Sequence, residues 1–143
     1  MNLSARNQLK ATVAAVKKGA VNDEVSLRLA DGTMLTSIIT ETSCENLGLK
    51  EGVEAYAVIK ATNVMIGDLD DGGLKLSARN QLKGTVDAVK DGMVNCEVDV
   101  TLAGGEKVTS VITMASAKRL GLAAGKEIRA IIKASDIMVG VKA

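Results

Sequence analysis

Ser-Ala-Arg-Asn-Gln-Leu-Lys occupies residues 4–10 of the chain and returns unchanged at residues 77–83. Extended outward at the same offset, the alignment pairs residues 4–67 with residues 77–140 without a gap, and 36 of the 64 pairs are identical. The 143-residue chain is therefore two copies of one small unit. Between the copies, Asp-Asp-Gly-Gly is typical of a turn or linker. We predict domains at 1–67 and 74–143, joined by a linker at 68–73.

The hydrophobic pattern within one copy predicts five short strands and one short helix. The strands of the first copy are expected at 9–13, 21–29, 34–40, 54–60 and 64–66. The last of them would close its own copy, and Ala-Asp-Gly at 30–32 is a hairpin signal. Ser43 is expected to N-cap the helix, Gly48 to end it and Leu49 to pack back against it. This order indicates a mainly all-β protein of tandem OB-like five-stranded β-barrels, each with one short helix.

The core of each copy must be built almost without aromatic residues. Hydrophobic residues make up 47% of the chain and aromatic residues 1%, which is the single Tyr56. Val, Ile, Leu, Ala and Met must fill the core, and they bury less area per residue than aromatic side chains. A unit of about 64 residues with such a core is marginal alone. We expect the two copies to pack on each other and on other chains.

Net charge and hydropathy argue against several classes of partner. The net charge is +1, so no charge excess drives general binding to nucleic acid or to acidic membranes. No apolar run is long enough to span a bilayer, and the N-terminal sequence lacks the apolar stretch of a signal peptide. We expect a soluble, cytoplasmic protein that binds neither nucleic acid nor membrane.

Catalytic constellations are missing from the sequence. Histidine is absent, which removes the commonest general base and a common metal ligand. The chain has no cluster of metal ligands, no glycine-rich phosphate loop of the right spacing and no nucleophile beside a plausible base. Cys44 aligns with Ala117, and Cys96 aligns with Asp23, so we expect buried thiols without a shared role. The sequence predicts a protein that is not an enzyme and binds no metal cation directly.

Both copies keep an identical set of hydrogen-bond donors. In the first copy they are Ser4, Arg6, Asn7, Thr36, Ser37, Thr40, Ser43 and Lys60; in the second they are Ser77, Arg79, Asn80, Thr109, Ser110, Thr113, Ser116 and Lys133. Hydroxyl, guanidinium and ammonium groups donate to the oxygens of an oxyanion and offset its charge. Duplicated copies also share residues for structural reasons such as helix capping, so residue chemistry alone leaves both explanations open.

Three segments together resemble the Mop family of molybdate-binding domains, the molbindins. They are the start at 4–10, Thr-Ser-Ile-Ile-Thr at 36–40 and Val-Ile-Lys-Ala at 58–61. The resemblance covers both copies, and the tandem arrangement is similar to that of the two-domain (di-Mop) molbindins. It implies an OB-like barrel and homotrimers with six Mop domains. It also implies molybdate or tungstate bound at domain interfaces, as a ligand and not as a catalytic cofactor.

The resemblance also implies site residues, position by position. One type of site would use Ser4, the backbone of Ala5, Arg6, Lys60 and the backbone of Ala61, with Thr40 and Ser43 from an adjoining domain. The second copy would supply Ser77, Ala78, Arg79, Thr113, Ser116, Lys133 and Ala134. A second type of site, near the threefold axis, would use Gly19, Val21, Asn22, Gly92, Val94 and Asn95.

The implied function is cytoplasmic storage or homeostasis of molybdenum by reversible oxyanion binding. Two alternatives stay open. An OB-type oligonucleotide binder would rely on exposed aromatic residues and a basic groove, and one tyrosine with a net charge of +1 argues against it. The other alternative is a purely structural oligomerisation module.

Overall fold

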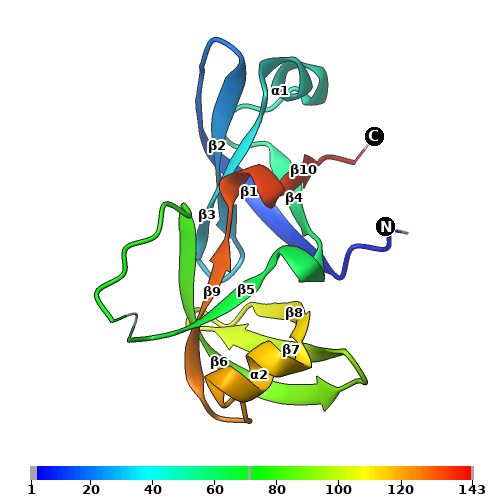
Figure 1. Ribbon diagram of the computed structural model, residues 1–143. Helices are drawn as coiled ribbons and strands as arrows, with labels where there is room; N and C mark the ends of the chain where they lie inside the picture. Colours follow the sequence, from blue (N-terminus) through cyan, green and yellow to red (C-terminus); the bar gives the residue numbers. More distant parts are fainter. Residues whose placement is uncertain (1–2, 71, 143) are drawn as a thin grey trace. The chain divides into compact units, whose positions relative to one another are not determined.

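The computed structural model describes residues 3–70 and 72–142 as two compact units (Figure 1). Asp71, in the predicted linker, lies outside the described residues. The first unit contains β1 (Asn7–Lys17), β2 (Asn22–Leu29), β3 (Met34–Thr40), α1 (Glu41–Leu47), β4 (Glu54–Ile59), the 3-10 turn η2 (Ala134–Asp136) and β10 (Met138–Gly140). The second contains η1 (Ala61–Asn63), β5 (Met65–Asp68), β6 (Asn80–Asp91), β7 (Asn95–Leu102), β8 (Lys107–Thr113), α2 (Met114–Leu120) and β9 (Glu127–Ile132). The predicted mainly-β fold of tandem five-stranded units, each with one short helix, is confirmed.

The two sequence copies exchange their fifth strands. The sheet of the first unit runs β10-β4-β1-β2-β3, and that of the second runs β5-β9-β6-β7-β8. In Figure 1, β10 lies beside β4, although the two are far apart in the sequence. The prediction that 64–66 closes its own copy is therefore wrong, because β5 pairs with β9 of the second unit. The two candidate strands have nearly the same residues, Met-Ile-Gly and Met-Val-Gly, so the pattern does not distinguish the two pairings.

Alternating side chains fill the interior of each unit. In β2, Val25, Leu27 and Leu29 point inward and are buried, as the period of two requires. The expected use of methionine in the core is not found. Met34, Met65, Met93 and Met138 are exposed and Met114 is half-buried, so among the described residues the core consists mainly of Val, Ile, Leu and Ala.

Buried hydroxyl and amide groups tie the strands together. The Ser37 Oγ, which is fully buried, donates to the Ile137 carbonyl oxygen at 2.6 Å, just before β10 begins. Ser110 makes the equivalent hydrogen bond to the Val64 carbonyl, just before β5. Because a buried carbonyl needs a donor, these bonds help to hold the exchanged strand in place. Ser37 and Ser110 are therefore structural and are not available as donors to a ligand.

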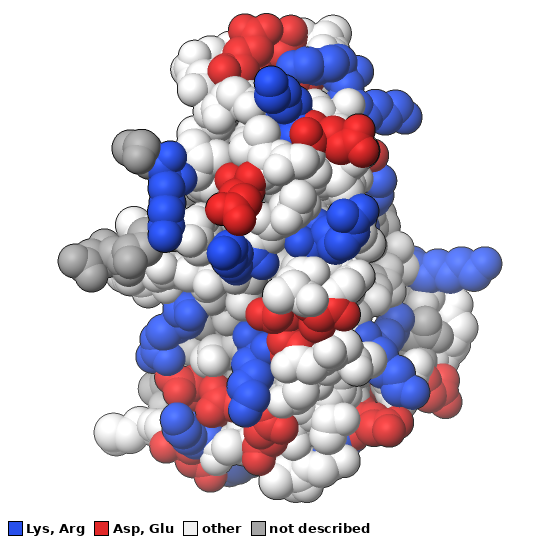
Figure 2. Space-filling view, turned by 180° about the vertical axis from the view of Figure 1, so that it is seen from behind, with Lys and Arg blue, Asp and Glu red and all other residues white. Residues whose placement is uncertain are grey.

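The caps of α1 differ from the prediction at one end. Thr40, not Ser43, is the N-cap, since its side-chain oxygen accepts the Ser43 backbone N–H. Gly48 ends the helix with φ 64°, a conformation that favours glycine, and Leu49 is buried against it, both as predicted. Within the described residues, neither helix is long and apolar enough to cross a membrane. Basic and acidic side chains are interspersed over the face seen in Figure 2.

Replacing Ser37 by Ala is expected to lower the free energy of unfolding by about 1–3 kcal/mol, because the Ile137 carbonyl loses its donor inside the unit. Urea unfolding followed by circular dichroism measures the change. Ser26→Ala, at a half-buried position of β2, is the matched control and should change the free energy by less than about 0.5 kcal/mol. Equal effects of the two substitutions would show that the Ser37 hydrogen bond does not hold the fifth strand.

Candidate functional site

Three of the predicted donors of the first copy meet where β1 begins and β4 ends. Asn7 pairs with Ile59 in the β1–β4 ladder, so Arg6 precedes and Lys60 follows this last pair. Ser4, Arg6 and Lys60 are exposed, and Ala5 is half-buried between them. The Ala61 side chain is buried, so Ala61 can offer a ligand only its backbone. We call this group, Ser4, Ala5, Arg6, Lys60 and Ala61, the cationic end.

Two residues of the same motif hold the cationic end in shape. The Asn7 Nδ2 donates to the Ile59 carbonyl oxygen at 3.2 Å, and Asn7 itself is buried. The Gln8 Nε2 donates to the Ala5 carbonyl oxygen at 3.0 Å. Asn7 was grouped with the possible ligand donors on sequence, and the structure gives it a positioning role instead. Gln8 was missed, although its identity in both copies was a signal.

The second copy repeats this arrangement. The Asn80 amide donates to the Ile132 carbonyl oxygen at 3.1 Å, and the Gln81 amide donates to the Ala78 carbonyl oxygen at 3.0 Å. Arg79 precedes Asn80 and Lys133 follows Ile132. The cationic end of the second copy is Ser77, Ala78, Arg79, Lys133 and Ala134, with both cations and Ser77 exposed and Ala134 buried.

Two further predicted donors of each copy lie at the start of its helix, whereas Thr36 and Thr109 lie within β3 and β8. The Thr40 Oγ1 accepts the Ser43 backbone N–H at 3.1 Å, and it donates to the Ser43 Oγ at 2.8 Å. The Ser43 hydroxyl proton can then point outward to a ligand. Thr113 and Ser116 reproduce the pair, with 2.9 Å between their oxygens. We call Thr40 with Ser43, and Thr113 with Ser116, the hydroxyl ends.

The cationic end and the hydroxyl end lie at opposite ends of a unit. Thr40 pairs with Asn22 at the start of β2, which follows the far end of β1, whereas Arg6 precedes the first residue of β1. Because β1 has eleven residues, it can separate the two ends by up to about 35 Å at about 3.3 Å per residue. One unit therefore cannot place both groups on one small ion.

The turn between β1 and β2, predicted as part of a second type of site, lies beside the hydroxyl end. Asn22 and Val21 are exposed, but much of the turn backbone is already used. The Gly19 N–H donates to the Asp23 Oδ1 at 3.1 Å, and the Val21 carbonyl accepts the Glu41 N–H at 2.9 Å. Among the predicted residues of this turn, Asn22 is thus the one with an exposed polar side chain.

In the equivalent turn of the second copy, between β6 and β7, backbone groups are likewise used in hydrogen bonds within the unit. The Gly92 N–H donates to the Asn95 carbonyl oxygen at 2.9 Å, and the Val94 carbonyl accepts the Met114 N–H at 2.8 Å. Val94 and Asn95 are exposed, and Asn95 pairs with Thr113. The predicted residues of the second site type are therefore beside the hydroxyl end in both copies.

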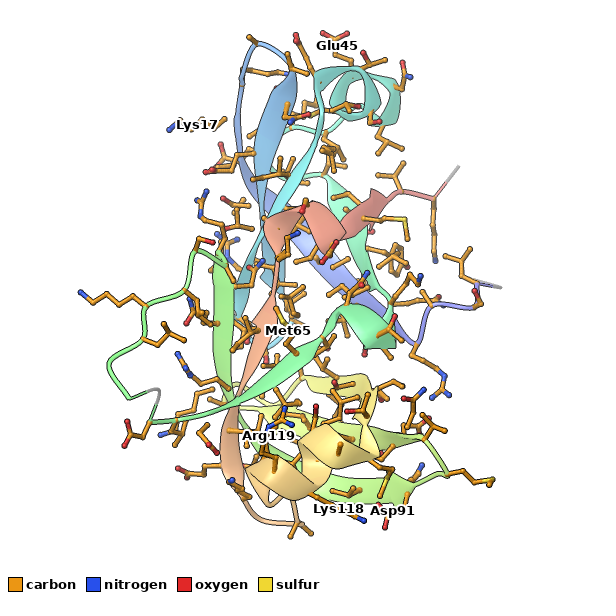
Figure 3. All side chains as sticks on the ribbon, in the orientation of Figure 1. Lys17, Glu45, Met65, Asp91, Lys118 and Arg119 are labelled. Atoms are coloured by element: carbon orange, nitrogen blue, oxygen red, sulfur yellow. The ribbon has the colours of Figure 1, made fainter. Side chains whose placement is uncertain are left out.

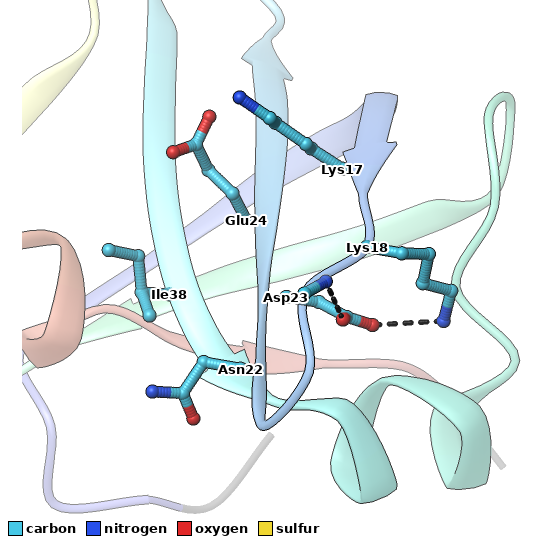
Figure 4. A pocket seen from close by; sticks show the side chains of 7 residues that line it. Lys17, Lys18, Asn22, Asp23, Glu24 and Ile38 are labelled. Atoms are coloured by element: carbon cyan, nitrogen blue, oxygen red, sulfur yellow. Dashed lines mark hydrogen bonds and ion pairs between the residues drawn. The ribbon is translucent and has the colours of Figure 1, made fainter.

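A shallow hollow of about 320 Å³ next to the first turn is bounded by an ion pair between the exposed Lys18 and the buried Asp23. In Figure 4 the Asp23 carboxylate points towards Lys18, while Lys17 and Glu24 point the other way. The Lys18 Nζ lies 2.9 Å from the Asp23 Oδ2, and the Asp23 side chain is fully buried. The hydrogen bond from Lys18 lowers the Asp23 pKa against the opposing effect of burial, and the Gly19 N–H lowers it further. The same hydrogen bond raises the Lys18 pKa.

The thiols are buried, as predicted. The Cys44 Sγ lies 4.0 Å from the Lys18 Nζ, and burial is the main cause that raises its pKa. Cys96 occupies the position of Asp23 in the second unit, and burial raises the pKa of this thiol too. In the part of the chain that the structure describes, no three His, Cys, Asp or Glu residues group as a metal site would require. Both thiols are therefore protonated packing residues at neutral pH.

Comparison with known proteins places this geometry among proteins named for molybdenum. The TOBE domain family matches residues 3–66 and 76–139. The chain is 46% identical over 141 residues to the molybdenum-pterin-binding protein MopA of Rhodobacter capsulatus, covering 99% of this chain and 53% of MopA. It is 61% identical over 66 residues to the molybdenum-pterin-binding protein 3 of Clostridium pasteurianum, covering 46% of this chain and 97% of that protein. The chain thus spans about half the length of the longer relatives and about twice that of the shorter one.

A solved structure resembles the whole chain. It is that of the cytoplasmic molybdate-binding protein ModG with molybdate bound, which is 44% identical with a TM-score of 0.95. The match covers 99% of this chain and 100% of that chain. Both units, including the exchanged strands, lie within the matched residues.

The Asp23 ion pair predicts a specific acid sensitivity. A lowered pKa in the folded state means that ionised Asp23 stabilises the fold fully above the ordinary carboxyl value of 3.8, and that this stabilisation is lost as the pH falls through the lower folded pKa. The melting temperature of the wild-type chain should therefore fall more steeply below about pH 4 than that of Asp23→Asn. Thermal unfolding at a series of pH values measures both slopes. Glu51→Gln, in an exposed turn, should keep the wild-type slope, and parallel curves for Asp23→Asn would refute the role of the pair.

Proposed function

Because the chain belongs to the TOBE domain family, as its resemblance to Mop domains predicted, we propose that it is a cytoplasmic molybdate-binding protein. It would store or buffer molybdenum by reversible binding and would catalyse no reaction. The observation that carries the proposal is the pair of cationic ends, each with an exposed arginine, lysine and serine beside the last residue pair of the β1–β4 or β6–β9 ladder. The likeness of the whole chain to ModG, whose structure holds molybdate, supports it.

The chemistry of the two ends fits a doubly charged tetrahedral anion. Guanidinium, ammonium and hydroxyl groups donate to all oxygens and offset the charge. Phosphate near neutral pH often carries a proton, which needs an acceptor, whereas molybdate presents acceptors only. Sulfate shares that property but is smaller, so pocket size must exclude it. Tungstate matches molybdate in shape and charge, so the proposed site should bind the two anions with nearly equal affinity.

The proposed site is shared between domains. Ser4, Ala5, Arg6, Lys60 and Ala61 of one copy would meet Thr40 and Ser43 of an adjoining domain, and the equivalents of the second copy would do the same. An interface between opposite ends is heterologous, and such interfaces close into rings when the rotation allows it. A homotrimer with six domains, which the resemblance implies, is an assembly of this kind.

A second type of site is proposed where the turns at 19–22 and 92–95 approach the axis of that trimer. Gly19, Val21 and Asn22, with Gly92, Val94 and Asn95, are the candidates. Since the Gly19 and Gly92 N–H groups already have acceptors, the Asn22 and Asn95 side chains would supply most of the contacts. Three copies of a weak donor around an axis can surround one anion.

An oligonucleotide-binding role has less support. The lone Tyr56 is half-buried, with the Lys142 ammonium 5.7 Å from its ring centre, and its counterpart is Arg129. The two copies therefore do not share an aromatic side chain on which nucleic-acid bases could stack. Mixed charges on the face in Figure 2 offer no continuous basic groove there.

Replacing Lys60 and Lys133 together by Ala should weaken molybdate binding by about 10- to 100-fold, as for the loss of a charged hydrogen bond of roughly 1.5–3 kcal/mol. Isothermal titration calorimetry with sodium molybdate measures the affinity. Lys10→Ala with Lys83→Ala is the matched control, because these exposed lysines lie on β1 and β6 and pair with Glu54 and Glu127. An unchanged affinity in the Lys60 and Lys133 variant would remove both lysines from the site.

Native mass spectrometry should find three chains in one assembly, with molybdate bound only to the assembled form. The resemblance to Mop domains implies the three chains, and neither unit alone can join its own cationic and hydroxyl ends. Thr40→Val with Thr113→Val, which keeps the side-chain shape, should reduce bound anion while the mass of the assembly is kept. A monomer that binds the same number of anions as the assembly would contradict shared sites.

A further inference from the structure

The two hydroxyl ends carry different charges, although the two cationic ends are identical. Thr40 and Ser43 stand on a helix with Glu41, Glu45 and Asn46, whereas Thr113 and Ser116 stand on a helix with Met114, Lys118 and Arg119 at the same positions. Figure 3 shows Glu45 on α1, and Lys118 and Arg119 on α2. The copies have therefore diverged where the proposed site receives its hydroxyls.

Arg119 contacts the predicted ligand residue directly. Its Nη2 donates to the Ser116 Oγ at 3.3 Å, and that oxygen also accepts the Thr113 hydroxyl. With both acceptor positions of the Ser116 Oγ occupied, its own proton is the one that can donate to a ligand. Arg119 thus places a positive charge beside the hydroxyl and favours its outward orientation. The first copy has Asn46 at this position, which brings no charge.

Some of the charge differences between the two helices are balanced by opposite differences at neighbouring positions, and others are not. Glu45 is among the acidic groups that raise the Lys18 pKa, and Lys118 shares a hollow of about 180 Å³ with Asp91. The charges at these two positions both reverse sign between the copies, so their sum is unchanged. The replacements Glu41 to Met114, which removes a negative charge, and Asn46 to Arg119, which adds a positive one, together make these two helix positions more positive by two charges in the second copy.

We propose that Arg119 raises the affinity for the oxyanion at the sites completed by Thr113 and Ser116, so that these sites fill before those completed by Thr40 and Ser43. The inference rests on the proposed molybdate-binding function. Arg119 adds attraction and guanidinium donors to one class of site, while Glu41 repels the dianion at the other. Both groups are near the surface, so the difference is moderate and decreases with added salt. The chain then buffers molybdate over a wider concentration range than equal sites allow.

The test exchanges the residues of the two copies in the full chain. Calorimetric titration of the wild type with sodium molybdate at low ionic strength should resolve a tight and a weak class of site. Arg119→Asn should weaken the tight class by about tenfold, the lower end for a charged hydrogen bond. Asn46→Arg should strengthen the weak class by a similar factor, and a gain in affinity does not arise from misfolding.

Arg28→Thr is the matched control, since Arg28 is exposed near the opposite end of β2 from Asn22, pairs with Met34, and is Thr in the second copy. It should leave both classes unchanged. The inference is overturned if Arg119→Asn leaves the tight class unchanged, or if Arg28→Thr weakens it equally. A wild-type chain that binds molybdate in a single class would also overturn it and leave the proposed function intact. No binding of molybdate by the wild type would overturn the proposed function itself.

Discussion

The exchange of the fifth strand between the copies is the constraint on which the remaining structure depends. Each sheet is completed by a strand from the other copy, and a buried serine hydroxyl bonds to the backbone just before that strand. The chain leaves β4 at Lys60 and β9 at Lys133, so the crossing segments that carry the exchanged strands also begin with the lysines of the cationic ends. The segments that follow β4 and β9 therefore both complete the sheets and position these lysines at the surface.

The local structure followed from the sequence where one residue decides one conformation. The strand expected at 34–40 is β3, and Gly48 ends α1 because its positive φ favours glycine. The partner of the fifth strand could not be predicted, since two nearly identical strands compete for two nearly identical edges. The N-cap was displaced by three residues because Thr40 and Ser43 both have capping side chains, and only backbone geometry shows which one accepts the hydrogen bond.

For the candidate site, the sequence predicted a set of repeated polar residues but not which of them the fold itself uses. Asn7 and Ser37 resemble Arg6 and Thr40 as repeated polar residues, yet both are buried against backbone carbonyls. Burial separates donors that serve the fold from donors that serve a ligand, and it depends on which strand lies across the sheet. Repetition of a residue in both copies therefore indicated that the residue was constrained. It did not indicate whether the fold or a ligand imposed the constraint.

Duplication allows the two copies to differ at a site that combines the cationic end of one domain with the hydroxyl end of another. A chain with one copy gives every unit the same hydroxyl end, whatever its assembly, so all equivalent sites bind alike. Two copies in one chain can keep identical cationic ends, which the anion needs for charge, while the helix positions around the hydroxyls change. Lys18 and Glu45 of the first copy correspond to Asp91 and Lys118 of the second, so the charges at these two positions reverse together and their sum is the same in both copies. The threonine and serine of the hydroxyl ends are identical in both copies, so no change in them offsets the positive charge of Arg119. That charge therefore remains available to alter the affinity for the anion.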